Sequence, residues 1–572
     1  MTAVASQPPG VAFPSWLSRL QEAFGGRLLL CLAIAHGGLK GFNAGGGNAG
    51  LVGVPIDFLL REFQVDAASL QVYKAAVMLP WSIKPLLGLL SDGLPVCGYH
   101  RLPYFVISAL AGSCACLAIP LLPNSSLLFV LFLLFCIFLQ VSWTDLLSEA
   151  VYSVRLKEFP SQGPNLISFV WGAIAVGKLA SVALVGPIMG YFGNRAPYLA
   201  GFPVALLALL IPFFNLAEER PSQERRCARV SGADLPLAVV ALVIGAGALG
   251  LGLVSVLGGS LQLKVAAAGA LAVLCLGLVS LTLSPVIAKV NAFFFLQHLC
   301  SLSIDGASFY FFTDGEEQYA EGPHFSTVFY TSVLGLVSTA CSLLGMFAYN
   351  RWLQHWSYPR ILIVGNLLSV SVSLLSCVVF LRWNLRLGIS DRFFVLASGA
   401  VSTVVFEIAW LPGMLIISQL CPEGREATMF ALLAGMANLG MALGSYFGAF
   451  LLHTLGVEPR GALGESAQFD RLWLAALLAA LGPCLPLCLV HVLVPDVGQQ
   501  EKIKGLDSAT QGSPLARFLA RRRRKVPENI SLEMQSIVGS PAAWSEVEIG
   551  NAREMRSQES PVSATLLKTS PH

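Results

Sequence analysis

Long apolar segments alternate with short polar loops along most of the chain. Each is close to the 20 or so residues that a helix needs to cross a bilayer. This pattern predicts an all-α, polytopic membrane protein of about fourteen transmembrane helices. The expected segments are Arg27–Asn48, Leu70–Leu90, Pro103–Leu121, Leu127–Tyr152, Ile167–Phe192, Pro197–Phe214, Leu237–Leu257, Val265–Ala288, Ala292–Thr313, Thr327–Tyr349, Ile361–Leu381, Phe393–Leu420, Ala427–Leu452 and Leu472–Val494.

A charged linker splits this array into six segments, then two segments without charged residues, then six more. The two sixes carry traces of a repeat, because Gln140-x-x-Trp143 matches Glu407-x-x-Trp410. Two repeated six-helix halves with a midplane site are typical of secondary transporters. The expected organisation is a cytosolic N-terminal segment (1–24), an N-terminal half (25–216), a cytosolic linker (217–234), two extra helices (235–288), a C-terminal half (289–496) and a disordered cytosolic tail (497–572).

Glycines spaced by four recur in the fifth helix of each half. Because this spacing places them on one face, we expect close backbone contacts there. They are Gly186 and Gly190 in the first half, and Gly440, Gly444 and Gly448 in the second.

Composition agrees with a membrane protein. The chain is 55% hydrophobic and 12% charged, with a net charge of +3; soluble domains carry roughly twice that charged fraction. The small net charge argues against a nucleic-acid partner. The basic run Arg521–Lys525 favours a cytosolic C-terminus, and an even helix count places the N-terminus there too. We expect a monomer in the plasma membrane or an organellar membrane.

Seven ionisable residues lie inside apolar segments, where each costs about 2.5–3.5 kcal/mol. They cannot face lipid, so pairing or a wet cavity must compensate. We expect substrate binding by Lys40, Lys84, Trp143, Lys178, Asp305, Glu407 and Trp410, and proton coupling or gating by Asp92, Arg101, Asp145 and Glu149.

Structural roles compete with these functional ones. Asp145 and Glu149 share a helical face, so one could carry a proton, or one could hold Arg101 in a salt bridge. Lys84 and Lys178 could bind an anionic substrate, or pair with Asp145, Glu407 or Asp305. The Trp residues could be ordinary core or lipid-facing aromatics.

No enzyme or cofactor signature is present. The chain has no glycine-rich phosphate loop ending in Lys-Ser or Lys-Thr, and no His-x-x-x-His pair. The thirteen cysteines follow no metal-binding spacing and read as small core residues. A channel or a receptor remains the alternative of another class, although mixed charges scattered over many helices differ from the rings of like charge in channels.

Several motifs resemble the folate–biopterin transporter family, in its protist-type branch. The most specific is Pro80-Trp81-Ser82-Ile83-Lys84-Pro85, followed by Leu86–Asp92. Asp145-Leu-Leu-Ser-Glu149-Ala-Val-Tyr152 and Cys421-Pro422-Glu423-Gly424-Arg425 are similar to further family motifs. Two positions depart from the family pattern: His100 replaces a second Arg, and Val151 replaces a Lys.

The resemblance implies a major-facilitator-like fold that moves folates, pterins or, in some relatives, S-adenosylmethionine. The residues suit such substrates independently. A glutamate tail needs Lys or Arg, a pterin edge can donate to a carboxylate, and its flat ring needs an aromatic wall. Proton-driven uptake would use one of the acids.

Overall fold

The computed structural model describes residues 13–47, 49–221, 235–422, 426–501, 503 and 508–524. In these ranges every named element is helical, which confirms the predicted all-α class. Most of the predicted linker (222–234), Arg425, Lys502, Lys504 and the tail from residue 525 lie outside the described residues. The chain forms two units, 1–513 and 514–572, which are described separately.

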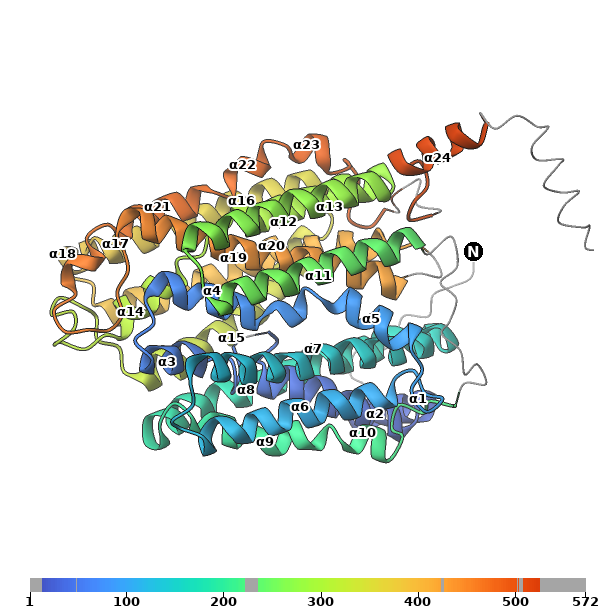
Figure 1. The fold of residues 1–572 in the computed structure, drawn as a ribbon, viewed down its shortest axis with the longest axis horizontal. Helices are drawn as coiled ribbons and strands as arrows, with labels where there is room; N and C mark the ends of the chain where they lie inside the picture. Colours follow the sequence, from blue (N-terminus) through green and yellow to red (C-terminus); the bar gives the residue numbers. More distant parts are fainter. Residues whose placement is uncertain are drawn as a thin grey trace, which may run out of the picture. The chain divides into compact units, whose positions relative to one another are not determined.

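The helices of the first unit run side by side as a bundle (Figure 1). The N-terminal half holds α1 (Phe13–Phe24), α2 (Gly26–Leu32), η1 (Ala33–Asn43), α3 (Pro55–Glu62), α4 (Ala67–Val77), η2 (Leu79–Trp81), α5 (Lys84–Gly93), α6 (Leu102–Leu121), α7 (Leu127–Glu158), η3 (Pro160–Gln162), α8 (Gly163–Phe192), α9 (Ala196–Leu207) and α10 (Leu210–Phe213).

Two long helices follow the linker, α11 (Leu235–Leu257) and α12 (Leu261–Thr282). The C-terminal half holds α13 (Pro285–Cys300), α14 (Asp305–Thr313), η4 (Phe329–Val333), α15 (Leu334–Ala348), η5 (Tyr349–Leu353), α16 (Tyr358–Ser373), α17 (Leu375–Phe380), α18 (Trp383–Arg386), α19 (Asp391–Gln419), α20 (Glu426–Leu455), η6 (Ser466–Phe469), α21 (Leu472–Leu481), α22 (Cys484–Leu487) and α23 (Val490–Leu493).

Twelve helices in the described ranges are long and apolar enough to cross a membrane. Each corresponds to one of the expected segments. The two other expected segments, Arg27–Asn48 and Leu70–Leu90, are interrupted helices: α2 continues as the π-helix η1, and α4 passes through the 3₁₀ turn η2 into α5.

The sequence accounts for the second interruption. Pro80 and Pro85 each lack a backbone donor and disfavour a continuous α-helix, and they bracket the junction between η2 and α5. Interrupted helices in transporters are typical of substrate and ion sites, because they leave backbone groups for ligands. Both interruptions lie next to a predicted site lysine, Lys40 or Lys84.

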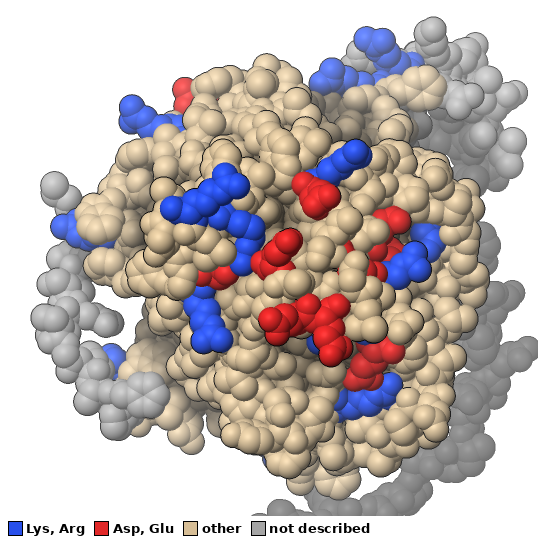
Figure 2. All heavy atoms as spheres, turned by 90° about the vertical axis from the view of Figure 1, so that its left-hand side faces the viewer, with Lys and Arg blue, Asp and Glu red and all other residues tan. Residues whose placement is uncertain are grey.

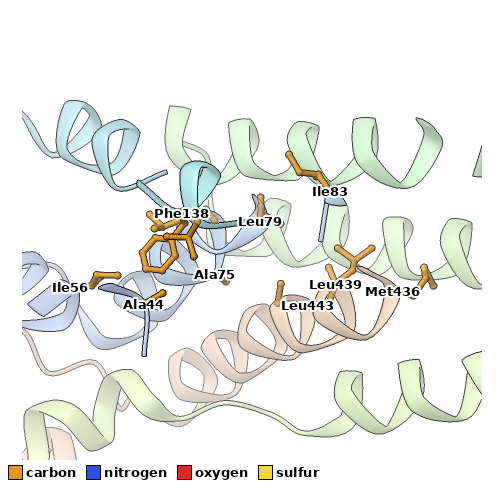
Figure 3. Close-up of a cluster of buried hydrophobic side chains, with 14 of the residues drawn as sticks. Ala44, Ile56, Ala75, Leu79, Ile83, Phe138, Met436, Leu439 and Leu443 are labelled. Atoms are coloured by element: carbon orange, nitrogen blue, oxygen red, sulfur yellow. The ribbon is translucent and has the colours of Figure 1, made fainter. Parts of the chain in front are cut away.

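The two halves share a continuous apolar core. Figure 3 shows Ala75 and Leu79 of the N-terminal half near Leu439 and Leu443 of α20, all of them buried. This packing lets α4 and α20 run against each other across the interface between the halves.

The predicted close backbone contacts are confirmed for the glycines of α20. An added Cβ at Gly444 would lie 2.8 Å from the His298 carbonyl oxygen, and one at Gly448 would lie 1.9 Å from that of Ser303. In α8 the neighbours are side chains instead: a Cβ at Gly186 would lie 2.5 Å from the Ser332 hydroxyl, and one at Gly190 would make only an ordinary contact with Val328. Only glycine permits these close approaches.

The two extra helices lie along the outside of the interface. The α11 helix packs on α4 and α5, whereas α12 packs on α20 and α13. The expected boundaries of the second one were wrong: α12 begins at Leu261, so it includes Lys264, and it ends at Thr282 because Pro285 begins α13.

Parts of the two terminal regions are ordered, including part of the tail that was predicted to be disordered. Residues 13–24 form α1, where Leu20 and Phe24 are buried, and beyond residue 496 Gln499, Ala509 and Ser513 are buried. In the second unit, α24 (Pro514–Arg524) is helical. The apolar pattern does not reveal these three segments, because each is short and rich in polar residues.

Candidate functional site

Asp145 lies at the centre of a buried charge cluster in the N-terminal half. Its carboxylate is 2.5 Å from Lys84 Nζ and 2.8 Å from Lys40 Nζ. Glu149, one turn further along α7, is 3.5 Å from Lys84 Nζ and 3.9 Å from Lys40 Nζ. The cluster therefore holds two cations and two anions, which balance one another.

Three elements bring these charges together. The long α7 helix presents Asp145 and Glu149 on one face, Lys84 begins α5 directly after the Pro-containing turn, and Lys40 lies in the last turn of η1. Asp145 is fully buried, whereas the Glu149 side chain is 25% exposed. Only Glu149 of the two acids therefore has ready access to water.

Two residues of the cluster were missed from the sequence. His36 Nδ1 lies 3.3 Å from Asp145, and its Nε2 lies 3.1 Å from the Ser148 hydroxyl. Trp81 places its ring under both ammonium groups, 5.1 Å from Lys84 and 5.8 Å from Lys40. A neutral His is not costly in an apolar segment, so the sequence gives no signal at His36. Trp81 lies in the Pro80–Pro85 motif, where the sequence alone does not indicate its role.

A second set of residues spans the two halves; Lys178, Glu407 and Trp410 of this set were predicted as site residues, and Trp171 was not. Lys178 of α8 interacts electrostatically with Glu407 of α19, which accepts a hydrogen bond from Ser342. Trp171 and Trp410 form an edge-to-face pair with centroids 6.5 Å apart, and Lys40 lies over Trp171 at 5.8 Å. Through Trp171 the two sets of residues adjoin.

Asp305 and Trp143 lie elsewhere. Asp305 interacts with Lys74, which is 2.7 Å from Asp57, so these three form a separate group. Trp143 is 6% exposed and packs on Tyr104, with ring centroids 5.2 Å apart. Trp143 points away from Asp145 because two residues along an α-helix turn the side chain by about 200°.

In this conformer neither Asp145 nor Glu149 forms the alternative salt bridge with Arg101. Both acids lie against Lys40 and Lys84 instead. Arg101 interacts with Asp92, and its backbone N–H donates to Glu219, at 3.1 Å to Oε1. The Glu219 carboxylate also accepts from the N–H groups of His100 and Leu102, so this linker residue caps the start of α6.

Two surface grooves lie away from the charge cluster. One, of about 480 Å³, lies between α6 and the α9–α10 region. Another, of about 300 Å³, lies between η1 and α9. Their linings are apolar and suit lipid chains, so we assign neither to a polar substrate. Among the described residues no group of His, Cys, Asp and Glu is arranged to hold a metal ion.

The halves are tied together at the end of the bundle that holds α3 and α14. Arg61 of α3 donates to the Thr313 carbonyl oxygen at 3.3 Å and lies 3.6 Å from Asp314. Ala67 N–H donates to Pro459 O at 2.9 Å. Figure 2 shows acidic and basic side chains intermingled on this end.

Asp314 at this end is expected to make stability depend on pH. Burial raises its pKa to about 7, although Arg61 opposes this. A raised carboxyl pKa contributes stability at low pH, which is lost as the pH rises through the folded-state value. We therefore expect the midpoint of thermal unfolding to fall between pH 6 and pH 8 more in the wild type than in Asp314→Asn. Asp470→Asn, at an exposed acid on the same end, should keep the wild-type difference; an unchanged difference in Asp314→Asn would contradict the prediction.

Solved structures of transporters have the same fold. A peptide transporter of the POT family in complex with sulfate superposes with a TM-score of 0.57 at 13% identity, covering 85% of this chain and 99% of that one. A D-xylose–proton symporter superposes with a TM-score of 0.51 at 13% identity, covering 85% and 100%. The major-facilitator-like fold predicted from the sequence is thus confirmed.

Relatives in sequence are named as transporters. A probable folate-biopterin transporter of Arabidopsis thaliana is 26% identical over 84% of this chain and 85% of its own length. A folate-biopterin transporter of Synechocystis is 27% identical over 78% of this chain and 79% of its own length. A folate transporter of Plasmodium falciparum is 24% identical over 79% of this chain and 85% of its own length.

The predicted resemblance, which began from the Pro80–Pro85 motif, is confirmed by these matches. The relatives of this chain are named as transporters, not as enzymes. Residues 49–509 match the model of the BT1 family. This multi-pass membrane transport protein therefore belongs to the BT1 family.

Proposed function

We propose that the chain is a proton-coupled carrier of folate- or pterin-type small molecules, with Lys40, Lys84, Asp145 and Glu149 as its central site. The observation that carries the proposal is the balanced charge cluster between interrupted helices. The names of the relatives support the substrate class.

The charge balance supports proton coupling. Two lysines already have two carboxylate partners in this conformer. A substrate carboxylate that enters would add a negative charge to a site of low dielectric, which is costly unless a proton enters too. Glu149 is the candidate proton acceptor, because its side chain is partly exposed whereas Asp145 is buried.

The aromatic residues supply a surface for a flat ring. Trp81 and Trp171 face the cations of the cluster, and Trp410 adjoins Trp171 from the other half. Trp171 is 50% exposed although it packs against both Lys40 and Trp410. A planar heterocycle that stacks here would contact both halves at once, as alternating access requires.

Among the described residues, the hydrogen bonds between the two halves lie in the middle of the bundle and at the end that holds α3 and α14. In the proposal, this conformer is closed at that end, and substrate exchange occurs at the opposite end, where α1 and α5 terminate.

Uptake of labelled folate and biopterin tests the proposal. Lys84→Met and Lys178→Met should each weaken folate binding by about 2–4 kcal/mol, because a desolvated carboxylate would lose its partner. Biopterin has no carboxylate and should be affected much less. Lys264→Met, which removes a lysine from α12 beside Tyr73, should leave both substrates unaffected.

Equal losses for the two substrates would contradict direct binding and leave these lysines a structural role only. Glu149→Gln tests the coupling separately, since uptake should lose its dependence on a proton gradient while exchange of bound substrate continues. Gradient-driven uptake by Glu149→Gln at the wild-type level would exclude Glu149 as the proton acceptor. If the protein transported S-adenosylmethionine saturably but neither folate nor biopterin, the proposed substrate class would be wrong.

A further inference from the structure

The helix α24 has one apolar side and a strongly basic end. Leu515 and Phe518 are spaced three residues apart, which places them on one side of the helix. The Phe518 side chain is 60% exposed and Leu515 is 36% exposed. An unbroken run of basic residues follows, Arg521–Lys525.

The chain before α24 is fastened to the first unit. The Gln499 side chain donates to the carbonyl oxygens of Leu353, at 2.9 Å, and Trp356, at 3.0 Å, and it accepts from the Tyr349 hydroxyl. It is 2% exposed. Gln499 thus holds the chain against η5 and the turn that follows it.

A second attachment lies just before the helix. The Ala509 carbonyl oxygen accepts a hydrogen bond from Ser284 N–H at 2.8 Å, and Ser513 is 1% exposed. Ser284 directly precedes Pro285, where a membrane-spanning segment begins. Because the end of a span marks the surface of the bilayer, the covalent chain delivers Pro514 close to that surface.

We propose that α24 binds the anionic lipid surface of the membrane in which the protein lies. Its apolar side would enter the boundary between headgroups and acyl chains, and its arginines would contact lipid phosphates. A helix of this length is marginally stable alone in water, so an anionic surface would also stabilise it. An RNA partner would use the basic run and would leave the apolar side unexplained.

Hydrogen exchange of the full-length protein in lipid nanodiscs tests this. Amides of residues 515–524 should exchange at least about tenfold more slowly when about 30% of the phosphatidylcholine is replaced by phosphatidylserine. High salt should abolish much of this protection, because it screens surface charge. Equal exchange in neutral and anionic discs would overturn the proposal.

Two variants separate the contributions of charge and apolar surface. Arg521–Arg524 changed to Gln should lose the protection in anionic discs, and Phe518→Gln should weaken it while keeping the charge. Arg386→Gln, at an exposed position in α18, is the matched control and should behave as the wild type. Protection that survives in both α24 variants, or that RNA produces equally in neutral discs, would refute the lipid assignment.

Discussion

Asp145→Asn is expected to destabilise the folded protein by about 3–5 kcal/mol, the usual cost of removing one partner from a buried ion pair. Asp145 is the nearest counter-charge of both Lys40 and Lys84. The amide keeps the shape of the side chain but leaves two cations to Glu149 alone, at 3.5 and 3.9 Å. Thermal unfolding in detergent, together with the yield of monodisperse protein, measures the loss.

Rescue distinguishes charge imbalance from a packing defect. Adding Lys40→Met to Asp145→Asn leaves one cation, Lys84, with one anion, Glu149. Because the charges balance again, we expect part of the stability to return. Glu158→Gln is the control on the same helix: Glu158 pairs with Arg155 at the surface and is 46% exposed, and such pairs contribute about 0–1 kcal/mol. A fully stable Asp145→Asn protein would show that the cluster does not need its central anion.

Gly177→Ala is expected to disrupt the contact between η1 and α8. An added Cβ would lie 2.2 Å from the Gly37 carbonyl oxygen and 2.7 Å from Phe42 N. These are backbone atoms and cannot move aside as a side chain can. Overpacking usually costs about 1–3 kcal/mol, and we expect the upper end here, with loss of transport because Lys40 lies on the displaced segment.

Gly172→Ala on the same helix should stabilise the protein, whereas Gly177→Ala destabilises it. Nothing lies within 4 Å of a Cβ at Gly172, and Ala stabilises a helix by up to about 1 kcal/mol relative to Gly. The two variants therefore compare the same chemical change in open and occupied space. Equal unfolding temperatures would show that α8 and η1 are not held this closely.

The sequence identifies the charged residues of the cluster because each violates an expectation for lipid-facing helices. Lys40, Lys84, Asp145 and Glu149 stand out for this reason without any structure. Their pairing could not be derived, since it depends on which helices pack together. The same limit applies to Asp305, which the sequence places with them but which interacts electrostatically with Lys74 in the structure.

Aromatic residues carry less information in the sequence. Trp143 and Trp171 look alike in an apolar segment, because a Trp costs little either in a core or beside a cavity. Helix packing separates them, with Trp143 against Tyr104 and Trp171 against Trp410. Helix continuity was equally hidden: the apolar pattern of Arg27–Asn48 is compatible with either an α- or a π-helix.

The π-helix η1 has a mechanical consequence. Such a segment carries more residues per turn than an α-helix, and this surplus can migrate along the helix if successive hydrogen bonds exchange partners one at a time. Each residue of migration would rotate the side chains it passes by about 100°. Lys40 lies within this segment, so a shift of one residue could swing its ammonium group out of the cluster while the helix ends stay where they are.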